Sequence, residues 1–183
     1  NLQRQILHPR GAVGRAKTES AAETIARLRP DLKLRAYSCR LTQDNVGEVI
    51  APYDFVVEAT DNFESKFLIN DACVSLGKPF SHAGVIGMGG QTMTVIPGKG
   101  PCYRCVFGDV PDSADVPAPH LAGILGSVAG VIGAIQATEA IKYLAGCGTL
   151  LVARLLTWDA LQMVFRTIQL PADRRCRACG GIT

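Results

Sequence analysis

The sequence predicts an α/β fold in which a partly parallel sheet continues into antiparallel strands. Helix-like and strand-like periodicities alternate between residues 15 and 96, which is typical of a βαβ arrangement. The apolar run Phe55–Val57 has the composition of a strand that is covered on both faces. Two Cys-x-x-Cys pairs add a structural metal site to this fold.

Composition narrows the class of protein further. The chain has 183 residues, 48% of them hydrophobic and 19% charged, which suits one globular domain and excludes long disorder. The net charge is +3 and the basic residues are scattered apart from those at 174–175, so we expect neither nucleic-acid nor membrane partners. No secretory leader follows Asn1, so we expect a cytoplasmic protein. Because the first residue is Asn, we also expect a processing site or a longer polypeptide.

The first predicted helix runs from Arg15 to Arg29, with apolar residues on one side and Pro30 after its end. Lys17 falls in its first turn, where a cation opposes the positive end of the helix dipole. That position indicates either a nearby anion or an ordinary solvated lysine. The alternation from Leu32 to Tyr37 predicts a strand with one covered face. Thr42 is the expected cap of a short helix that ends at Ile50.

The strand at Phe55–Val57 is the centre of the predicted site, because Thr60, Asp61 and Asn62 follow directly at its carboxyl end. Ligands of open α/β sheets bind at that edge, beside the N-terminus of the next helix. Asp61 is therefore the leading candidate for a functional residue. The alternative is that Asp61 only caps the helix, and both roles are compatible.

A helix from Asn62 to Leu76 is expected next, closed by Gly77 and Pro79. It leads to two strands, Phe80–Ile86 and Gln91–Ile96, joined by the glycine-rich turn 87–90. That turn is not a dinucleotide-binding fingerprint, since it lacks the third glycine and precedes a strand.

The second half begins with a loop over Pro111–Pro119. The run Leu121–Ile135 is apolar and rich in glycine, but polar residues continue the same helix and about 20 apolar residues are needed to span a bilayer. We therefore expect a buried helix that packs closely on a neighbour, and a homodimer interface at this helix. Arg154–Ala160 and Met163–Leu170 are predicted antiparallel strands, with Trp158 in the core.

The strongest chemical signal is the pair of motifs formed by Cys102, Cys105, Cys176 and Cys179. Each Cys-x-x-Cys can turn two thiolates toward one ion, and four thiolates make a closed structural zinc site without an open position for substrate. The alternatives are two disulfides or redox pairs, but nothing in the sequence indicates an oxidising compartment. Three further residues are expected to be ordinary buried or half-buried thiols: Cys39, Cys73 and Cys147.

Taken together, several motifs resemble the MoeB/ThiF/HesA adenylyltransferases, which activate ubiquitin-like sulfur carriers and are related to ubiquitin-activating enzymes. The resemblance covers essentially the whole chain. It rests on Asn1-Leu2-Gln3-Arg4-Gln5, Gly14-Arg15-Ala16-Lys17, Ala59-Thr60-Asp61-Asn62, Asn70-Asp71-Ala72, Gly90-Gln91, Cys102-Tyr103-Arg104-Cys105, Gly130-Val131-Ile132-Gly133 with Gln136-Ala137, and Cys176 to Gly180.

The resemblance implies a Rossmann-like ubiquitin-activating-enzyme fold and an ATP-dependent adenylation of a carrier protein that ends in Gly-Gly. Sulfur transfer in molybdopterin or thiamin biosynthesis is the implied pathway. By the same resemblance, the ATP site includes Asn1, Arg4, Gln5, Lys17 and Asn62, Asp61 holds Mg²⁺, and the four cysteines hold Zn²⁺. The implied catalytic residues are Arg4, Lys17 and Asp61.

Two departures from the family pattern matter. The family's first strand, its Gly-rich turn and an acidic ribose-binding residue precede the point where this chain starts, so residues 1–183 are expected to be one ThiF-type domain without that segment. Alone, the chain should then show little ATP–pyrophosphate exchange. Pro119 stands where many relatives have a cysteine, which argues against a covalent step there. His82 and His120 are expected to be structural.

Two other function classes remain open at this stage. A non-catalytic, zinc-stabilised dimeric module that binds a ubiquitin-fold partner would account for the missing Gly-rich turn. A nicotinamide-dependent dehydrogenase fragment would share the fold, but it would explain neither the four cysteines nor the pairing of Arg4 with Lys17.

Overall fold

The computed structural model describes residues 2–111, 123–171, 173 and 175–180. They form two compact units, residues 2–40 and residues 41–180, each of which is described by itself. The first unit contains a short 3₁₀ turn, η1 (Arg10–Ala12), and helix α1 (Lys17–Leu28), which confirms the first predicted helix with slightly narrower bounds. The N-terminal segment is tied to α1 because the Thr24 hydroxyl donates to the Leu7 carbonyl at 2.9 Å.

The predicted strand at Leu32–Tyr37 is wrong, because the structure has no regular element there. A strand exists only where a neighbour completes its hydrogen-bond ladder, and no strand lies beside this segment among the described residues. Its leucines are correspondingly exposed, Leu32 to 50% and Leu34 to 46%.

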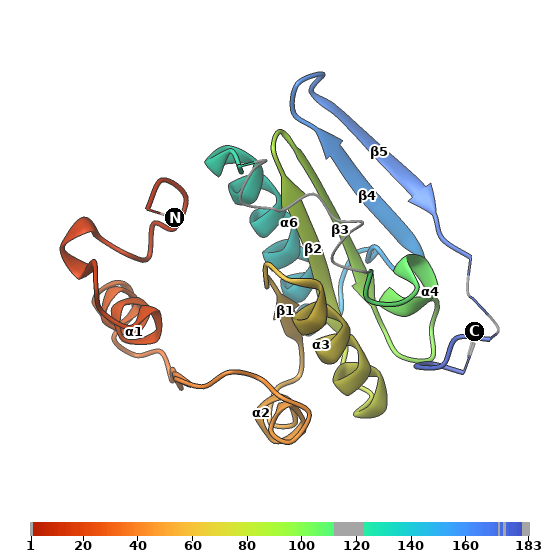
Figure 1. The fold of residues 1–183 in the computed structure, drawn as a ribbon, viewed down its shortest axis with the longest axis horizontal. Helices are drawn as coiled ribbons and strands as arrows, with labels where there is room; N and C mark the ends of the chain where they lie inside the picture. Colours follow the sequence, from red (N-terminus) through yellow and green to blue (C-terminus); the bar gives the residue numbers. More distant parts are fainter. Residues whose placement is uncertain (1, 112–122, 172, 174, 181–183) are drawn as a thin grey trace. The chain divides into compact units, whose positions relative to one another are not determined.

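The second unit is built on a five-stranded sheet of order β1-β2-β3-β4-β5 (Figure 1). Strand β1 (Val56–Glu58) runs parallel to β2 (Phe80–Ile86), with Glu58 opposite His82. The remaining pairs are antiparallel: β2 with β3 (Gly89–Val95), β3 with β4 (Arg154–Asp159), and β4 with β5 (Val164–Gln169). The predicted mixed sheet, its hairpin turn at Gly87 and its C-terminal strand pair are therefore confirmed.

Helices cover the two faces of this sheet. Helix α3 (Phe63–Ser75) and the short α4 (Tyr103–Phe107) pack on one core cluster, which contains Phe67, Phe80 and Met93. Helix α6 (Gly126–Ala145) packs on a second cluster with Ala83 and Trp158. Because Phe80 and Ala83 are an odd number of residues apart on one strand, their side chains point to opposite faces, so α3 and α6 lie on opposite sides of the sheet (Figure 1).

Three predicted details are corrected by the structure. Val57 is 49% exposed, so β1 is not covered on both faces; among the described strands it lies at the edge of the sheet and pairs with β2 alone. The short helix α2 (Val46–Ile50) starts later than predicted, and no side chain caps it. Thr42 lies at the start of the turn before α2, where its backbone carbonyl accepts the Val46 N–H.

Helix α6 begins at Gly126 because residues just before it bond elsewhere. The Gly87 N–H donates to the Gly123 carbonyl, and the Leu125 N–H donates to the Gly87 carbonyl, so this segment pairs with the β2–β3 turn. The loop predicted at Pro111–Pro119 and the first residues of the helix predicted from Leu121 fall almost wholly outside the described residues. Among those described, no helix has the length and hydropathy to cross a bilayer.

Candidate functional site

The carboxyl end of β1 leads directly into the N-terminus of α3, and Asp61 lies at this junction. The side-chain oxygen of Asn62 accepts the Ser65 N–H at 2.8 Å, so Asn62 is the cap of α3. The capping role considered for Asp61 is therefore wrong. The Asp61 side chain is exposed, and its carboxylate accepts no hydrogen bond from any residue that the structure describes.

Directly beneath this junction lies a buried polar network centred on Glu58, which is only 1% exposed. One carboxylate oxygen accepts both the Thr60 N–H at 2.7 Å and the Thr60 hydroxyl at 2.5 Å. The Lys66 ammonium donates to both oxygens at 3.0 Å and to the Ala83 carbonyl at 2.7 Å. His82 Nδ1 lies 2.8 Å from the other oxygen. The carboxylate thus has donors from the junction, from α3 and from β2.

The charge states in this network follow from its geometry. Burial alone would raise the pKa of the Glu58 carboxyl, but the hydrogen bond from His82 and the charge of Lys66 outweigh it and hold that pKa below its usual value. Burial lowers the pKa of His82, so its imidazole is neutral at pH 7. Since Glu58 is ionised, His82 Nδ1–H donates to it. His82 Nε2 is then an unprotonated acceptor, and it is buried without a hydrogen-bond partner in the described part of the chain.

Sequence reasoning missed this network, although His82 had been expected to be structural and is buried. One signal was present in the sequence: Glu58 lies at the end of a predicted strand and Lys66 lies within a predicted helix beside apolar residues, and such charged residues are rarely buried unless paired. Their pairing with His82, which is 24 residues from Glu58 along the chain, depends on the parallel register of β1 and β2.

The remaining nucleotide-site candidates lie in the first unit. Arg4 and Gln5 are half-buried in the N-terminal segment, and Lys17 is the exposed first residue of α1. This segment is held against α1 by the hydrogen bond from Thr24 and by another between His8 and Ser20 at 3.1 Å. Asn1 lies outside the described residues. Asp61 and Asn62 belong to the second unit.

The four candidate metal ligands come together in one cluster. The sulfur atoms of Cys102, Cys105, Cys176 and Cys179 all lie within 4.8 Å of one another. Neighbouring sulfurs are 3.8, 3.6 and 3.4 Å apart, whereas a tetrahedron of Zn–S bonds of about 2.3 Å has edges of about 3.8 Å. A disulfide bond is only about 2.05 Å long, and all four cysteines are free. The cluster can hold a metal ion, as the spacing predicted.

The cysteine cluster is joined to α3 by the residues between its first two ligands. The Tyr103 N–H donates to the Asn70 side-chain oxygen at 2.9 Å. The Arg104 guanidinium makes two hydrogen bonds of 2.7 Å to Asp71 and lies over the Phe67 ring, 4.6 Å from its centroid. Bidentate pairs of this kind fix geometry well. The cluster is therefore rigidly attached to the helix that follows Asp61.

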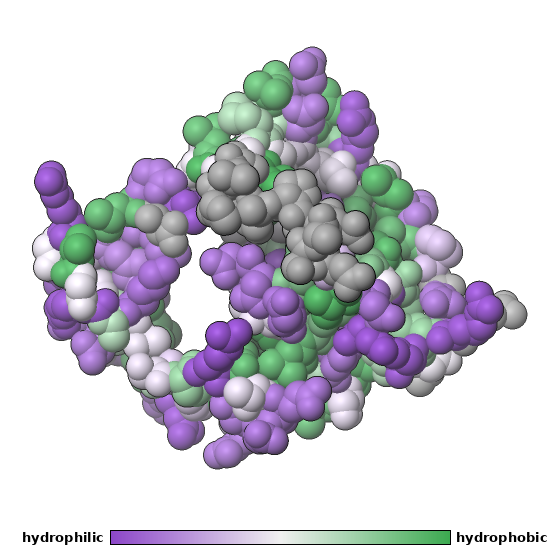
Figure 2. Space-filling model, viewed as in Figure 1, coloured by the Kyte–Doolittle hydropathy of each residue, from purple (hydrophilic) through white to green (hydrophobic). Residues whose placement is uncertain are grey.

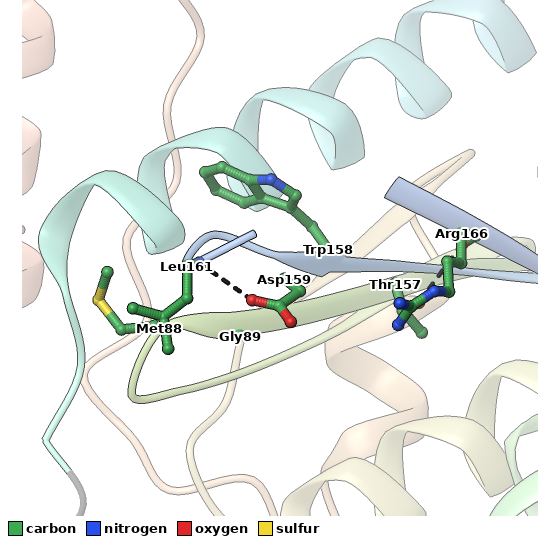
Figure 3. Close-up of a pocket in the computed structure, with 7 residues that line it drawn as sticks. All are labelled: Met88, Gly89, Thr157, Trp158, Asp159, Leu161 and Arg166. Atoms are coloured by element: carbon green, nitrogen blue, oxygen red, sulfur yellow. Dashed lines mark hydrogen bonds between the residues drawn. The ribbon is translucent and has the colours of Figure 1, made fainter. Parts of the chain in front are cut away.

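A hollow of the second unit lies elsewhere, where β3 begins, β4 ends and β5 begins (Figure 3). It has a volume of about 400 Å³, and Asp159 at its centre accepts the Leu161 N–H at 3.0 Å. The surface over the β4–β5 hairpin is partly apolar and partly polar (Figure 2). Leu161 and Phe165 of this hairpin are exposed. No residue of the predicted nucleotide site lines this hollow, so we assign it no part in that site.

The remaining cysteines are only partly as predicted. Cys73 is buried, and burial raises the pKa of its thiol to about 12. Cys39 and Cys147 are exposed rather than buried or half-buried.

Residues 1–178 match the ThiF family. The chain is 42% identical over 180 residues to the SAMP-activating enzyme E1 of Haloferax volcanii, covering 98% of this chain and 66% of that protein. It is 40% identical over 185 residues to the sulfur carrier protein adenylyltransferase of Thermus thermophilus, covering 98% and 68%. With the adenylyltransferase and sulfurtransferase MOCS3 of Drosophila persimilis, identity is 39% over 180 residues, covering 98% and 40%.

Solved structures agree on the fold. The crystal structure of E. coli MccB with ATP has a TM-score of 0.84 at 21% identity, and the match covers 98% of this chain and 55% of that one. The chain therefore spans between about two fifths and two thirds of the length of these relatives.

Proposed function

Since the chain belongs to the ThiF family, we propose that it is the adenylation domain of an enzyme that activates the C-terminal glycine of a ubiquitin-like sulfur-carrier protein. The names of the relatives, among them a sulfur carrier protein adenylyltransferase, support this activity. The observation that carries it is the exposed Asp61 carboxylate at the carboxyl edge of the sheet, which accepts no hydrogen bond within the described residues because Asn62 caps α3 instead. Sulfur transfer in cofactor biosynthesis is the proposed pathway.

The proposed reaction needs no general base, because a C-terminal carboxylate is already ionised at neutral pH. One of its oxygens attacks the α-phosphorus of ATP, and the bond from that phosphorus to the bridging oxygen breaks. Pyrophosphate leaves with the electron pair, and the carrier becomes an acyl-adenylate. The protein then has to position the reactants and offset negative charge. Arg4 and Lys17 would do so at the phosphate oxygens, while Asn1, Gln5 and Asn62 would contact the nucleotide.

The residues at the β1–α3 junction fit a magnesium ion. Mg²⁺ prefers carboxylate oxygens and keeps several waters, and the Asp61 side chain is an exposed carboxylate that accepts no hydrogen bond from the described part of the chain. A magnesium ion held by Asp61 would supply positive charge against the negative charge of the nucleotide phosphates. Asp61 is accordingly the proposed magnesium ligand.

The cysteine cluster fits zinc, since four sulfur ligands at nearly tetrahedral spacing are typical of closed structural zinc sites. Such a site would pin the C-terminal segment to α4. Free thiols suit a reducing compartment, so the cytoplasm is the proposed location. The exposed Ile141 and Leu144 of α6 support the proposed homodimer. We further propose that residues 1–183 are one ThiF-type domain.

The test is carrier-dependent formation of an acyl-adenylate. The full-length protein is incubated with ATP and candidate carriers that end in Gly-Gly, and the carrier mass is read by mass spectrometry. We expect an added AMP on one carrier and none on a version that lacks the last glycine. A carrier that binds but gains no AMP would favour a non-catalytic, zinc-stabilised module instead.

A further inference from the structure

The geometry points to Glu58, Thr60 and Lys66 as positioning residues that hold Asp61 in place for metal binding. We propose that the buried Glu58–Lys66 pair clamps Thr60 and thereby sets where the Asp61 carboxylate lies. This inference rests on the proposed function, because it concerns the same magnesium ligand. It assigns a role to three residues that do not themselves contact the nucleotide or the metal.

The first argument is how Thr60 is held. Both its backbone N–H and its hydroxyl donate to the same Glu58 oxygen, at 2.7 and 2.5 Å. Two hydrogen bonds from one residue to one carboxylate oxygen fix the backbone and side-chain torsions together. The residue immediately before Asp61 therefore has little freedom.

The second argument is that Asp61 is fixed on its other side as well. Asn62 is committed to the cap of α3, with an extended backbone at φ −134° and ψ 151°. Asp61 itself has no hydrogen bond within the described part of the chain. Its position is thus determined by its two neighbours, while its carboxylate oxygens stay available. This is the arrangement expected of a ligand whose surroundings orient it.

The third argument is energetic. Lys66 is 8% exposed and Glu58 1%, so both charges have lost nearly all their hydration. A buried ion pair of this kind often contributes no more stability than apolar residues of the same volume, because desolvation offsets the attraction. The pair is, however, well suited to specify one geometry: Lys66 makes three hydrogen bonds, to both Glu58 oxygens and to the Ala83 carbonyl on β2. It locks the junction to the sheet.

The experiment compares two substitutions of Thr60 in the full-length protein. Thr60→Val keeps the shape of the side chain but removes the hydroxyl, and Thr60→Ser keeps the hydroxyl. Binding of Mn²⁺ to the protein saturated with a non-hydrolysable ATP analogue is measured by electron paramagnetic resonance. Loss of a residue that orients a metal ligand typically weakens metal affinity by about 10- to 100-fold, so we expect about tenfold weaker Mn²⁺ binding for Thr60→Val and recovery with Thr60→Ser.

Three controls separate the possible outcomes. Thr138→Val removes a comparable hydroxyl from α6, where it donates to the Ala134 carbonyl, and should leave Mn²⁺ affinity unchanged. Because Thr60 is only half-buried, its variants are expected to fold, and unfolding midpoints check this. Asp61→Asn should weaken Mn²⁺ binding more than Thr60→Val does.

Wild-type Mn²⁺ affinity in Thr60→Val, with Asp61→Asn impaired, would overturn the positioning role alone. Wild-type affinity in Asp61→Asn would overturn both that role and the proposed magnesium ligand. If Thr60→Val instead loses Mn²⁺ affinity and Thr60→Ser fails to restore it, the hydroxyl is not the clamp and the inference is equally overturned.

Discussion

Removing one ligand of the cysteine cluster tests whether a metal cross-links this fold. Cys102 and Cys176 are 74 residues apart in sequence, yet their sulfurs lie 3.6 Å apart. If a metal joins them, it closes a loop of that length, and a cross-link of this size removes unfolded-state entropy worth about 4 kcal/mol. A typical domain is stable by only about 5–15 kcal/mol, so Cys176→Ser should remove a large share of the total.

The assay is urea unfolding followed by the fluorescence of Trp158, which is buried in the core beneath α6. With a urea dependence of about 2 kcal/mol per molar, the midpoint should fall by about 2 M. Chelation of the wild-type protein should give the same shift, together with loss of bound zinc by elemental analysis. Cys147→Ser, at an exposed cysteine outside the cluster, is the matched control and should unfold like the wild type. An unchanged midpoint in Cys176→Ser or in fully chelated protein would refute the cross-link.

Three further predictions concern packing, pH and thiol reactivity. A Cβ added at Gly90 would lie 2.5 Å from Cγ1 of Ile132 on α6, so Gly90→Ala should lower the free energy of unfolding by about 1–3 kcal/mol, measured by chemical unfolding. Gly89→Ala is the control and should be close to neutral, because the nearest atom to its Cβ would be 3.7 Å away. Equal effects of the two substitutions would contradict the close approach of α6 to Gly90. Burial lowers the pKa of His82 in the folded state. The stability that neutral His82 contributes is therefore complete above its unfolded-state pKa of about 6.5, and it is lost as the pH falls below that value toward the folded-state pKa. Between pH 7 and 5 the melting temperature should therefore drop less in His82→Gln than in the wild type, with His8→Gln as control; identical pH profiles for His82→Gln and wild type would rule this out. In the folded protein, iodoacetamide should label the exposed Cys39 and Cys147 readily and Cys73 hardly at all, since burial raises the pKa of the Cys73 thiol to about 12. Peptide mass spectrometry identifies the labelled cysteines. Rapid labelling of Cys73 would disprove its burial.

The elements that could be predicted from the sequence are those fixed by local pattern. Strand β1, helix α3 and the β2–β3 hairpin follow one another, and Gly77, Pro79 and Gly87 mark the turns between these elements. The cysteine cluster could be predicted because ligand spacing within each motif limits where the thiols can point.

The misses come from interactions that the local pattern does not contain. Residues 32–37 alternate like a strand but lack a neighbouring strand in the described structure, and pairing cannot be read from one segment. Helix α4 has five residues, too few for a periodicity. The contact of Glu58 with His82 needs the register of two strands joined through a helix. Residue type alone does not decide between Asn62 and Asp61 as the cap of α3, because Asn and Asp cap helices about equally well.

The most direct measurement is ATP–pyrophosphate exchange by the full-length protein in the presence of its carrier, with Asp61→Asn beside the wild type. Asp61 is exposed, so the substitution should leave the unfolding midpoint unchanged. If Asp61 holds the metal that offsets charge on the transferred phosphate, the exchange rate should fall about 100-fold or more. Exchange in Asp61→Asn at the wild-type rate, or its absence from a folded wild-type protein supplied with carriers that bind it, would contradict the account.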